Sequence, residues 1–132
     1  MPVLTSFFLY LFLLFAAPYL PSISHVFRTT EIGQGTIFWA KGDHDNPNPE
    51  NYCYRRARHI SKYLNDKELA IAHNTLPCGS WVIVFNPRTK KRVVARVTDR
   101  GPRHGIADLS RATAKAIRLN GKEQVVVLPM LR

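Results

Sequence analysis

The chain has 132 residues, 45% of them hydrophobic, and carries 19 Lys and Arg against 9 Asp and Glu. This length holds one small domain and excludes a multidomain enzyme. Residues 1–27 contain none of these charged residues, so the folded part is expected to follow them and to be strongly basic.

The N-terminal segment has the pattern of a secretory signal. Residues 7–17 form an unbroken apolar run of the length that is typical of the central part of such a signal. Pro18 and Pro21 would break a helix soon after this run, which argues against a stable membrane span. We predict a signal peptide at residues 1–25, with cleavage near the small residues Ser22 and Ser24, and export to the periplasm or the cell wall. Because no basic residue precedes the apolar run, an uncleaved anchor is the alternative.

Two cysteines, Cys53 and Cys78, are present. In a small exported domain, an even number of cysteines favours a disulfide over a metal or redox site. We therefore predict a Cys53–Cys78 bridge, and two buried free thiols are the alternative.

Regular elements are sparse in the first half of the chain that follows the signal. Residues 36–39 are β-branched or aromatic and follow Gly33 and Gly35, so we expect a first strand that is entered through a flexible turn. Residues 43–51 are too rich in Asp, Asn and Pro for a helix or strand. Residues 54–64 have apolar side chains at helical spacing, which predicts a short helix. Residues 68–72 predict a short strand.

The second half has clearer patterns. Residues 80–85 and 92–97 are rich in β-formers and are separated by a polar link, which predicts an antiparallel hairpin. Residues 98–107 contain Gly101-Pro102 and Gly105 and predict a loop. Asp108 or Ser110 is expected to cap a short helix. Residues 124–131 predict a terminal strand that is buried on both faces. In the short helix that Asp108 or Ser110 would cap, the inward face is expected to consist of Leu109, Ala112, Ala116 and Ile117.

Three motifs in the second half resemble the rare-lipoprotein-A (RlpA-like) family. They read AHNTLPCGSWV at 72–82, VTDRGP at 97–102 and IADLS at 106–110. The element pattern alone indicates a small mostly-β barrel. The resemblance implies more: a six-stranded double-psi β-barrel with one or two short helices over residues 32–132. It also implies an exported lytic transglycosylase that cleaves peptidoglycan glycan strands.

Asp99 is the leading catalytic candidate. It is expected at the point where a strand gives way to a loop, where a carboxylate can face a surface groove from an anchored backbone. An Asp in this position can instead close a turn by accepting backbone N–H bonds ahead of Gly101. In a lytic transglycosylase the C6 hydroxyl of muramic acid attacks the anomeric carbon, so one carboxyl can first donate and later accept a proton. Thr98 and Arg100, which flank Asp99, are predicted to contact the substrate.

The resemblance adds further candidates. It makes Asp108 the second catalytic carboxyl, although a helix cap would explain this residue equally well. It assigns His73 to orientation or proton handling, and a structural histidine with satisfied hydrogen bonds is the alternative. Trp39 is predicted to stack on a sugar ring, and Trp81 is the second aromatic candidate. Core packing is the alternative for both tryptophans.

One family feature is missing. The family carries a Thr-Ala-x-Gly-Glu stretch upstream of the histidine motif, whereas residues 58–64 read RHISKYL and contain no acid. Asp66 or Glu68 could replace the missing acid from a shifted loop. The difference keeps open a second interpretation, an expansin-like module that binds cell-wall polysaccharide without cutting it.

Composition also limits cofactors and partners. Asp43-His44-Asp45 lies in a polar stretch without a second ligand pair, so no metal and no cofactor are predicted. The net charge of +10 suits polyanions, but the Lys and Arg are scattered and form no nucleic-acid-binding motif. We therefore predict no nucleic acid partner. Peptidoglycan strands and anionic polymers of the cell envelope are the expected partners of a monomeric chain.

Overall fold

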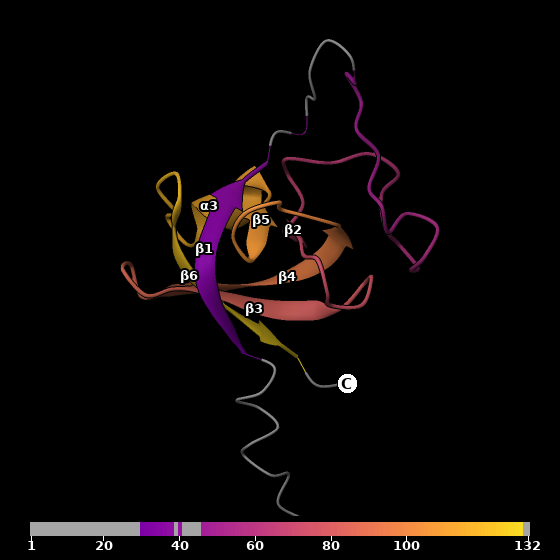
Figure 1. Ribbon diagram of the computed structural model, residues 1–132. Helices are drawn as coiled ribbons and strands as arrows, with labels where there is room; N and C mark the ends of the chain where they lie inside the picture. The colour runs from indigo at the N-terminus through magenta and orange to yellow at the C-terminus, as the bar shows by residue number, and fades with distance from the viewer. Residues whose placement is uncertain (1–29, 39, 41–45, 131–132) are drawn as a thin grey trace, which may run out of the picture.

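The computed structural model describes residues 30–38, 40 and 46–130. The predicted signal peptide, Trp39 and the Asp43-His44-Asp45 stretch lie outside the described residues. Six strands in the described part close into a barrel, and one short α-helix packs beside it (Figure 1). The described residues contain no helix long and apolar enough to cross a membrane. The elements are β1 (Glu31–Ile37), β2 (Ala70–Ala72), β3 (Trp81–Asn86), β4 (Lys91–Asp99), β5 (Ala107–Leu109), α3 (Arg111–Ala116) and β6 (Glu123–Pro129).

The strand order around the barrel is β1-β5-β2-β4-β3-β6. The pairs β1–β5 and β2–β4 are parallel, and the other four pairs are antiparallel. Exchanging β1, β2 and β3 with β4, β5 and β6 leaves this order and the directions of the pairs unchanged. Two interlocked three-stranded halves of this kind form a double-psi barrel, so the predicted fold class is confirmed.

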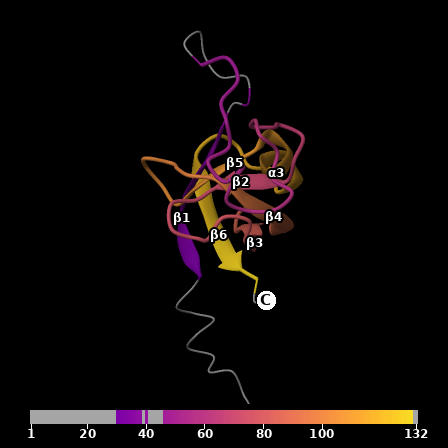
Figure 2. The same ribbon diagram turned by 90° about the vertical axis from the view of Figure 1, so that its right-hand side faces the viewer.

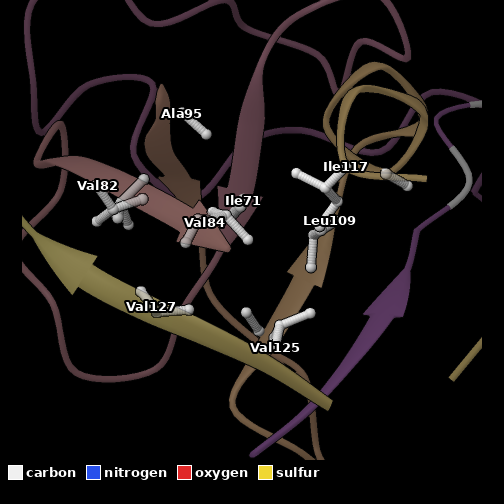
Figure 3. Packing of buried hydrophobic residues seen from close by; sticks show 11 residues of the cluster. Ile71, Val82, Val84, Ala95, Leu109, Ile117, Val125 and Val127 are labelled. Carbon is white, nitrogen blue, oxygen red and sulfur yellow. The ribbon is translucent and has the colours of Figure 1, made fainter. Parts of the chain in front are cut away.

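The core fills the inside of the barrel with β-branched and small side chains. Inward and outward residues alternate along each strand, as the pleat of a β-strand requires. Val82 and Val84 of β3 and Val125 and Val127 of β6 point inward and are fully buried (Figure 3). Ile117, which directly follows α3, closes one side of the cluster. The barrel is therefore a packed core, and a polar site has to lie on its outer surface or at its ends.

The hairpin of residues 80–85 and 92–97 and the short strand within 68–72 are confirmed as β3, β4 and β2. Two other predictions in the first half were wrong. Residues 54–64 form turns rather than a helix. Gly33 and Gly35 lie within β1 and do not form a turn before it. Both are needed for close packing, because a Cβ would lie 2.6 Å from the Ile106 side chain at Gly33 and 2.8 Å from Val125 at Gly35.

Predictions around the helix need correction as well. Ser110 is the N-cap, and its hydroxyl accepts from the Thr113 amide at 3.1 Å, whereas Asp108 lies in β5. The buried helix residues are Thr113 and Ala114, and Ala116 is exposed. The terminal strand, β6, alternates between buried and half-buried residues, so its two faces are not equally buried. The loop predicted at 98–107 begins after Asp99 and ends before Ala107.

A long segment without regular structure, residues 46–69, precedes β2 and stands largely at the top of the barrel in Figures 1 and 2. The predicted Cys53–Cys78 disulfide is present, with a Cα–Cα distance of 5.3 Å. The Cys53 amide also donates to the Thr98 carbonyl of β4 at 3.1 Å. Asn51 crosslinks the segment itself, because its side-chain amide donates to the carbonyls of Ser61 and Tyr63. The disulfide thus joins this segment to the turn between β2 and β3.

Removing the disulfide should lower the free energy of unfolding by about 3.5 kcal/mol, because the bridge closes a loop with a sequence separation of 25. Chemical denaturation of the Cys53→Ala/Cys78→Ala chain measures this loss. Reduction of the unmodified chain is the matched control and should produce a similar loss. A loss below about 1 kcal/mol in both experiments would show that the segment is held by its other contacts.

Candidate active site

Four outward-facing residues lie side by side on four neighbouring strands. Thr36 pairs with Asp108, Asp108 pairs with Ala72, and Ala72 pairs with Asp99. Directly paired residues present their side chains on the same face of a sheet. Leu109 and Ile71, the neighbours of Asp108 and Ala72 along the chain, point into the core. The pairing therefore places the two carboxyl groups on either side of a small alanine, with their backbones two strand spacings, about 10 Å, apart.

We call Thr36, Asp108, Ala72 and Asp99 the row. An irregularity in the pairing of β2 with β4 places the Asp99 side chain in it. Ile71 pairs with Val97, but the next residue, Ala72, pairs with Asp99, so one extra residue of β4 is inserted opposite this step. An inserted residue of this kind changes the direction of the side chain that follows it and is common beside active sites. Without the insertion Thr98 would face Ala72, and the carboxyl group would point to the other side of the strand.

The surroundings of Asp108 favour its protonated form. Burial raises the pKa of Asp108 above the ordinary value, a hydrogen bond from the Thr36 hydroxyl at 2.8 Å lowers it, and the negative charge of Asp99 raises it further, with a net rise. A negative charge on Asp99 therefore favours the protonated form of Asp108. These surroundings therefore help Asp108 to retain its proton.

Asp99 also contacts the long segment 46–69. The backbone amide of Tyr52 donates to Asp99 Oδ1 at 2.8 Å, and the neighbouring Cys53 amide donates to the Thr98 carbonyl. One carboxylate oxygen therefore has a fixed partner, and the side chain remains half-exposed. Asp99 does accept a backbone N–H, as the turn-closing alternative requires, but the donor lies 47 residues away rather than in the turn at Gly101.

His73 lies beneath the surface with 1% of its area exposed. Its Nδ1 accepts from the amides of Thr75 and Leu76 at 3.2 and 3.1 Å, so the proton of a neutral ring lies on Nε2. Nε2 is 3.2 Å from the Glu31 carboxylate, in a contact that is not aligned as a hydrogen bond. Only the backbone of His73 touches the pair, because its amide donates to the Asp99 carbonyl at 3.0 Å. The structure thus brings Asp99 and Asp108 together and directs the His73 ring toward Glu31.

Arg100 and Thr98 have contacts that fix the backbone. Arg100 donates to the carbonyls of His73 and Leu76, both at 2.8 Å, and its guanidinium lies 5.3 Å from the centre of the Tyr52 ring. It therefore connects the turn after β2 with the segment 46–69. Thr98 is 4% exposed, lines a cavity next to Trp81 and lies one residue before Asp99. The predicted substrate contacts of both residues stay predictions.

Other sequence candidates lie outside the row. Trp81 is 52% exposed, so the alternative that this residue packs in the core is wrong. Asp66 Oδ1 accepts from the Ala40 amide at 3.3 Å, and Glu68 accepts from the Ser61 hydroxyl, so neither acid contacts the Asp99–Asp108 pair through these bonds. Sequence reasoning missed Glu31, because it lies before the strand that was predicted at residues 36–39 and begins β1 only in the structure. The described residues include no group of three or more His, Cys, Asp and Glu side chains that could hold a metal ion.

Part of the chain is similar to curated proteins named endolytic peptidoglycan transglycosylase RlpA. It is 46% identical to the protein of Pasteurella multocida over 59 residues, which are 43% of this chain and 20% of the relative. It is 50% identical to that of Neisseria meningitidis serogroup A over 48 residues, 35% of this chain and 20% of the relative. A probable endolytic peptidoglycan transglycosylase RlpA of Synechocystis is 45% identical over 59 residues, 43% of this chain and 18% of the relative. The predicted resemblance to RlpA is confirmed.

The matched region spans about a fifth of the length of these curated relatives. No protein-family model matches the chain. The crystal structure of a rationally designed protein, mkDPBB_sym2, aligns with 76% of this chain and 99% of its own, with a TM-score of 0.48 and 12% identity. The fold assignment therefore depends on the strand pairings of this chain and not on that alignment.

The interaction between the two carboxyl groups can be tested by titration. In the Asp99→Asn variant the pKa of Asp108 should fall, because a negative charge that raises it is removed. In Thr36→Val the pKa should rise, because the hydrogen bond that stabilises the carboxylate is lost. NMR titration of the Asp108 carboxyl carbon measures both shifts. Equal pKa values in the three chains would contradict the arrangement of the row.

Proposed function

We propose that this chain is a lytic transglycosylase domain that cleaves peptidoglycan glycan strands between MurNAc and GlcNAc and leaves 1,6-anhydro ends. The observation that carries the proposal is the placement of Asp99 and Asp108 on either side of Ala72, on the outer face of the barrel. The names of the similar proteins, all endolytic peptidoglycan transglycosylases, support the choice of substrate.

Each of the two carboxyl groups carries out one proton transfer. Protonated Asp108 donates its proton to the glycosidic oxygen, and the bond from that oxygen to the anomeric carbon breaks. The C6 hydroxyl of the same muramic acid forms the new bond to the anomeric carbon, and the Asp99 carboxylate accepts the hydroxyl proton. No water is consumed, so the product carries a 1,6-anhydro ring. This scheme uses two carboxyl groups where the sequence suggested that one would suffice, because the surroundings of Asp108 favour its protonated form.

The remaining predicted residues have supporting roles in this proposal. His73 acts as a positioning residue, because its ring accepts two backbone amides of the turn that Arg100 also binds. Thr98 and Arg100 fix the backbone on both sides of Asp99. Trp39 supplies an aromatic surface for a sugar ring. The protein is exported by its N-terminal segment and acts as a monomer on peptidoglycan. Other anionic polymers of the envelope bind its basic surface.

One observation favours the alternative, a module that binds polysaccharide without cutting it. The stretch 58–64, where the family carries an acid, contributes Lys62, whose ammonium group lies 3.2 Å from the Glu50 carboxylate. The stretch therefore contributes a cation that is paired with Glu50, and it contributes no carboxyl group of its own. Under this alternative the chain would sediment with sacculi and release no new ends.

Incubation with purified sacculi distinguishes the two functions. Mass spectrometry should detect anhydro-muramic ends with the unmodified chain, and Asp99→Asn and Asp108→Asn should each lower their yield by about 100-fold or more. Asp66→Asn is the matched control, because it exchanges the same groups in a carboxyl that binds the Ala40 amide instead. Unchanged yields in both pair variants would remove the pair from the mechanism.

The rate should also report the protonation of Asp108. Activity should decrease as the pH rises through the pKa of this group, because deprotonation removes the acid. Since the pKa of Asp108 is raised, the decrease should occur above the pH at which an ordinary Asp ionises, about 3.9. Steady-state rates between pH 3 and pH 9, compared with the NMR titration of the same group, provide the measurement. A decrease that does not follow the titration of Asp108 would assign the acid to another residue.

A further inference from the structure

A cavity of about 340 Å³ lies on the outer face of the β3–β4 hairpin, and neither catalytic carboxyl group lines it. Its volume is in the range of small-molecule sites, about 300–1,000 Å³. The strands form one wall and the segment before β2 forms the other. The lining residues are Trp81, Val94, Arg96 and Thr98 from the strands and His59, Glu68 and Leu69 from the segment.

Exposed apolar side chains gather around this cavity. Trp81 is 52% exposed, Leu69 43% and Val94 42%, and all three line the same hollow. Single exposed apolar residues are normal on a protein surface, but a cluster of them around a concavity is typical of a binding site. The indole is the largest of the three, and an aromatic ring suits the apolar face of a ligand.

Arg96 contacts the indole and favours one orientation of it. Trp81 and Arg96 are direct neighbours on paired strands, and the guanidinium lies 5.3 Å from the centre of the indole. Arg96 is itself anchored, because it donates to the Gly79 carbonyl at 3.1 Å and to the His59 carbonyl at 3.0 Å. A ring that is already fixed loses less conformational entropy on binding, which favours affinity.

The polar groups of the cavity indicate what it binds. Glu68 uses Oε1 to accept the Ser61 hydroxyl, and Oε2 accepts no hydrogen bond from any residue that the structure describes. The residues that line the cavity with Trp81 thus include a carboxylate, an imidazole and a hydroxyl group. Because the guanidinium of Arg96 offsets the charge of Glu68, the lining favours a neutral ligand over a charged one.

We propose that this cavity is a second saccharide-binding site, which holds one pyranose ring of a glycan strand. The apolar face of the sugar lies on Trp81, and its hydroxyls bind Glu68 and His59. Thr98 lines the cavity and directly precedes Asp99, so the site and the carboxyl pair share one strand, with Arg96 and Asp99 about 10 Å apart along it. The proposal rests on the proposed function for the choice of a glycan, and it assigns to this surface the task of retaining the strand beside the catalytic pair.

Binding can be measured separately from cleavage. In a chain that carries Asp99→Asn, calorimetric titration with the tetrasaccharide of N-acetylglucosamine should detect binding. Adding Trp81→Ala should weaken the affinity about ten-fold, and adding Glu68→Gln should weaken it several-fold. Ile32→Ala is the matched control, because Ile32 is 61% exposed on β1 and does not line the cavity; it should leave the affinity unchanged. Trp81→Leu keeps an apolar side chain and should lose affinity like Trp81→Ala, which separates stacking from folding.

The two tryptophans of the chain allow a direct check of the location. With Trp39→Phe, the remaining indole emission comes from Trp81, and it should shift when the tetrasaccharide saturates the protein. Equal affinity in Trp81→Ala, unchanged emission at saturation, absent binding at millimolar sugar, or binding of an apolar peptide in place of the sugar would each overturn the proposal. If the Asp99 and Asp108 variants cleave sacculi at the normal rate while Trp81→Ala loses sugar binding, the proposal of the catalytic pair is wrong. The proposal of the saccharide site is then supported independently.

Discussion

The pairing of the short strand β2 between β5 and β4 is the constraint on which the site depends. All three residues of β2 pair with the parallel strand β4, and two of them, Ile71 and Ala72, also pair with the antiparallel strand β5. Ile71 enters the core, and Ala72 faces outward between the two carboxyl groups. Only 3% of the area of Ala72 is exposed, so a larger side chain in its place would collide with the residues that cover it. The core therefore fixes the catalytic geometry, because the inward position of Ile71 determines the outward position of its neighbour.

Loops outside the barrel complete this geometry. The disulfide joins Cys53 to the turn after β2, and the adjacent Tyr52 amide binds Asp99. Arg100 binds the carbonyls of that same turn, and the amide of Gly101 donates to the Asn74 side chain at 3.0 Å. Each carboxyl group thus has one anchored partner, a hydroxyl for Asp108 and a backbone amide for Asp99. Such anchoring keeps catalytic groups oriented without closing them off from solvent.

Much of the barrel follows from the sequence, and much of the site does not. Runs of β-forming and apolar residues predicted β3, β4 and β6, and the motif resemblance selected Asp99 and Asp108. Predictions from local sequence patterns were wrong where contacts between residues far apart in the sequence determine the structure. Gly33 and Gly35 suggested a turn, but they are strand residues that leave room for Ile106 and Val125. Asp108 had the pattern of a helix cap, yet its pairing with Ala72 places it in a strand. The contact between His73 and Glu31 joins residues 42 positions apart and has no local signature.

The central claim is that Asp99 and Asp108 work as one unit across Ala72. A double-mutant cycle on glycan cleavage tests it most directly, with Asp99→Asn, Asp108→Asn and the double variant assayed on the same sacculi. Groups that act in one proton-transfer scheme are strongly non-additive, so the double variant should be hardly slower than the slower single variant. If the two rate losses multiply, the carboxyl groups act independently, and the shared site inferred from the strand pairing is contradicted.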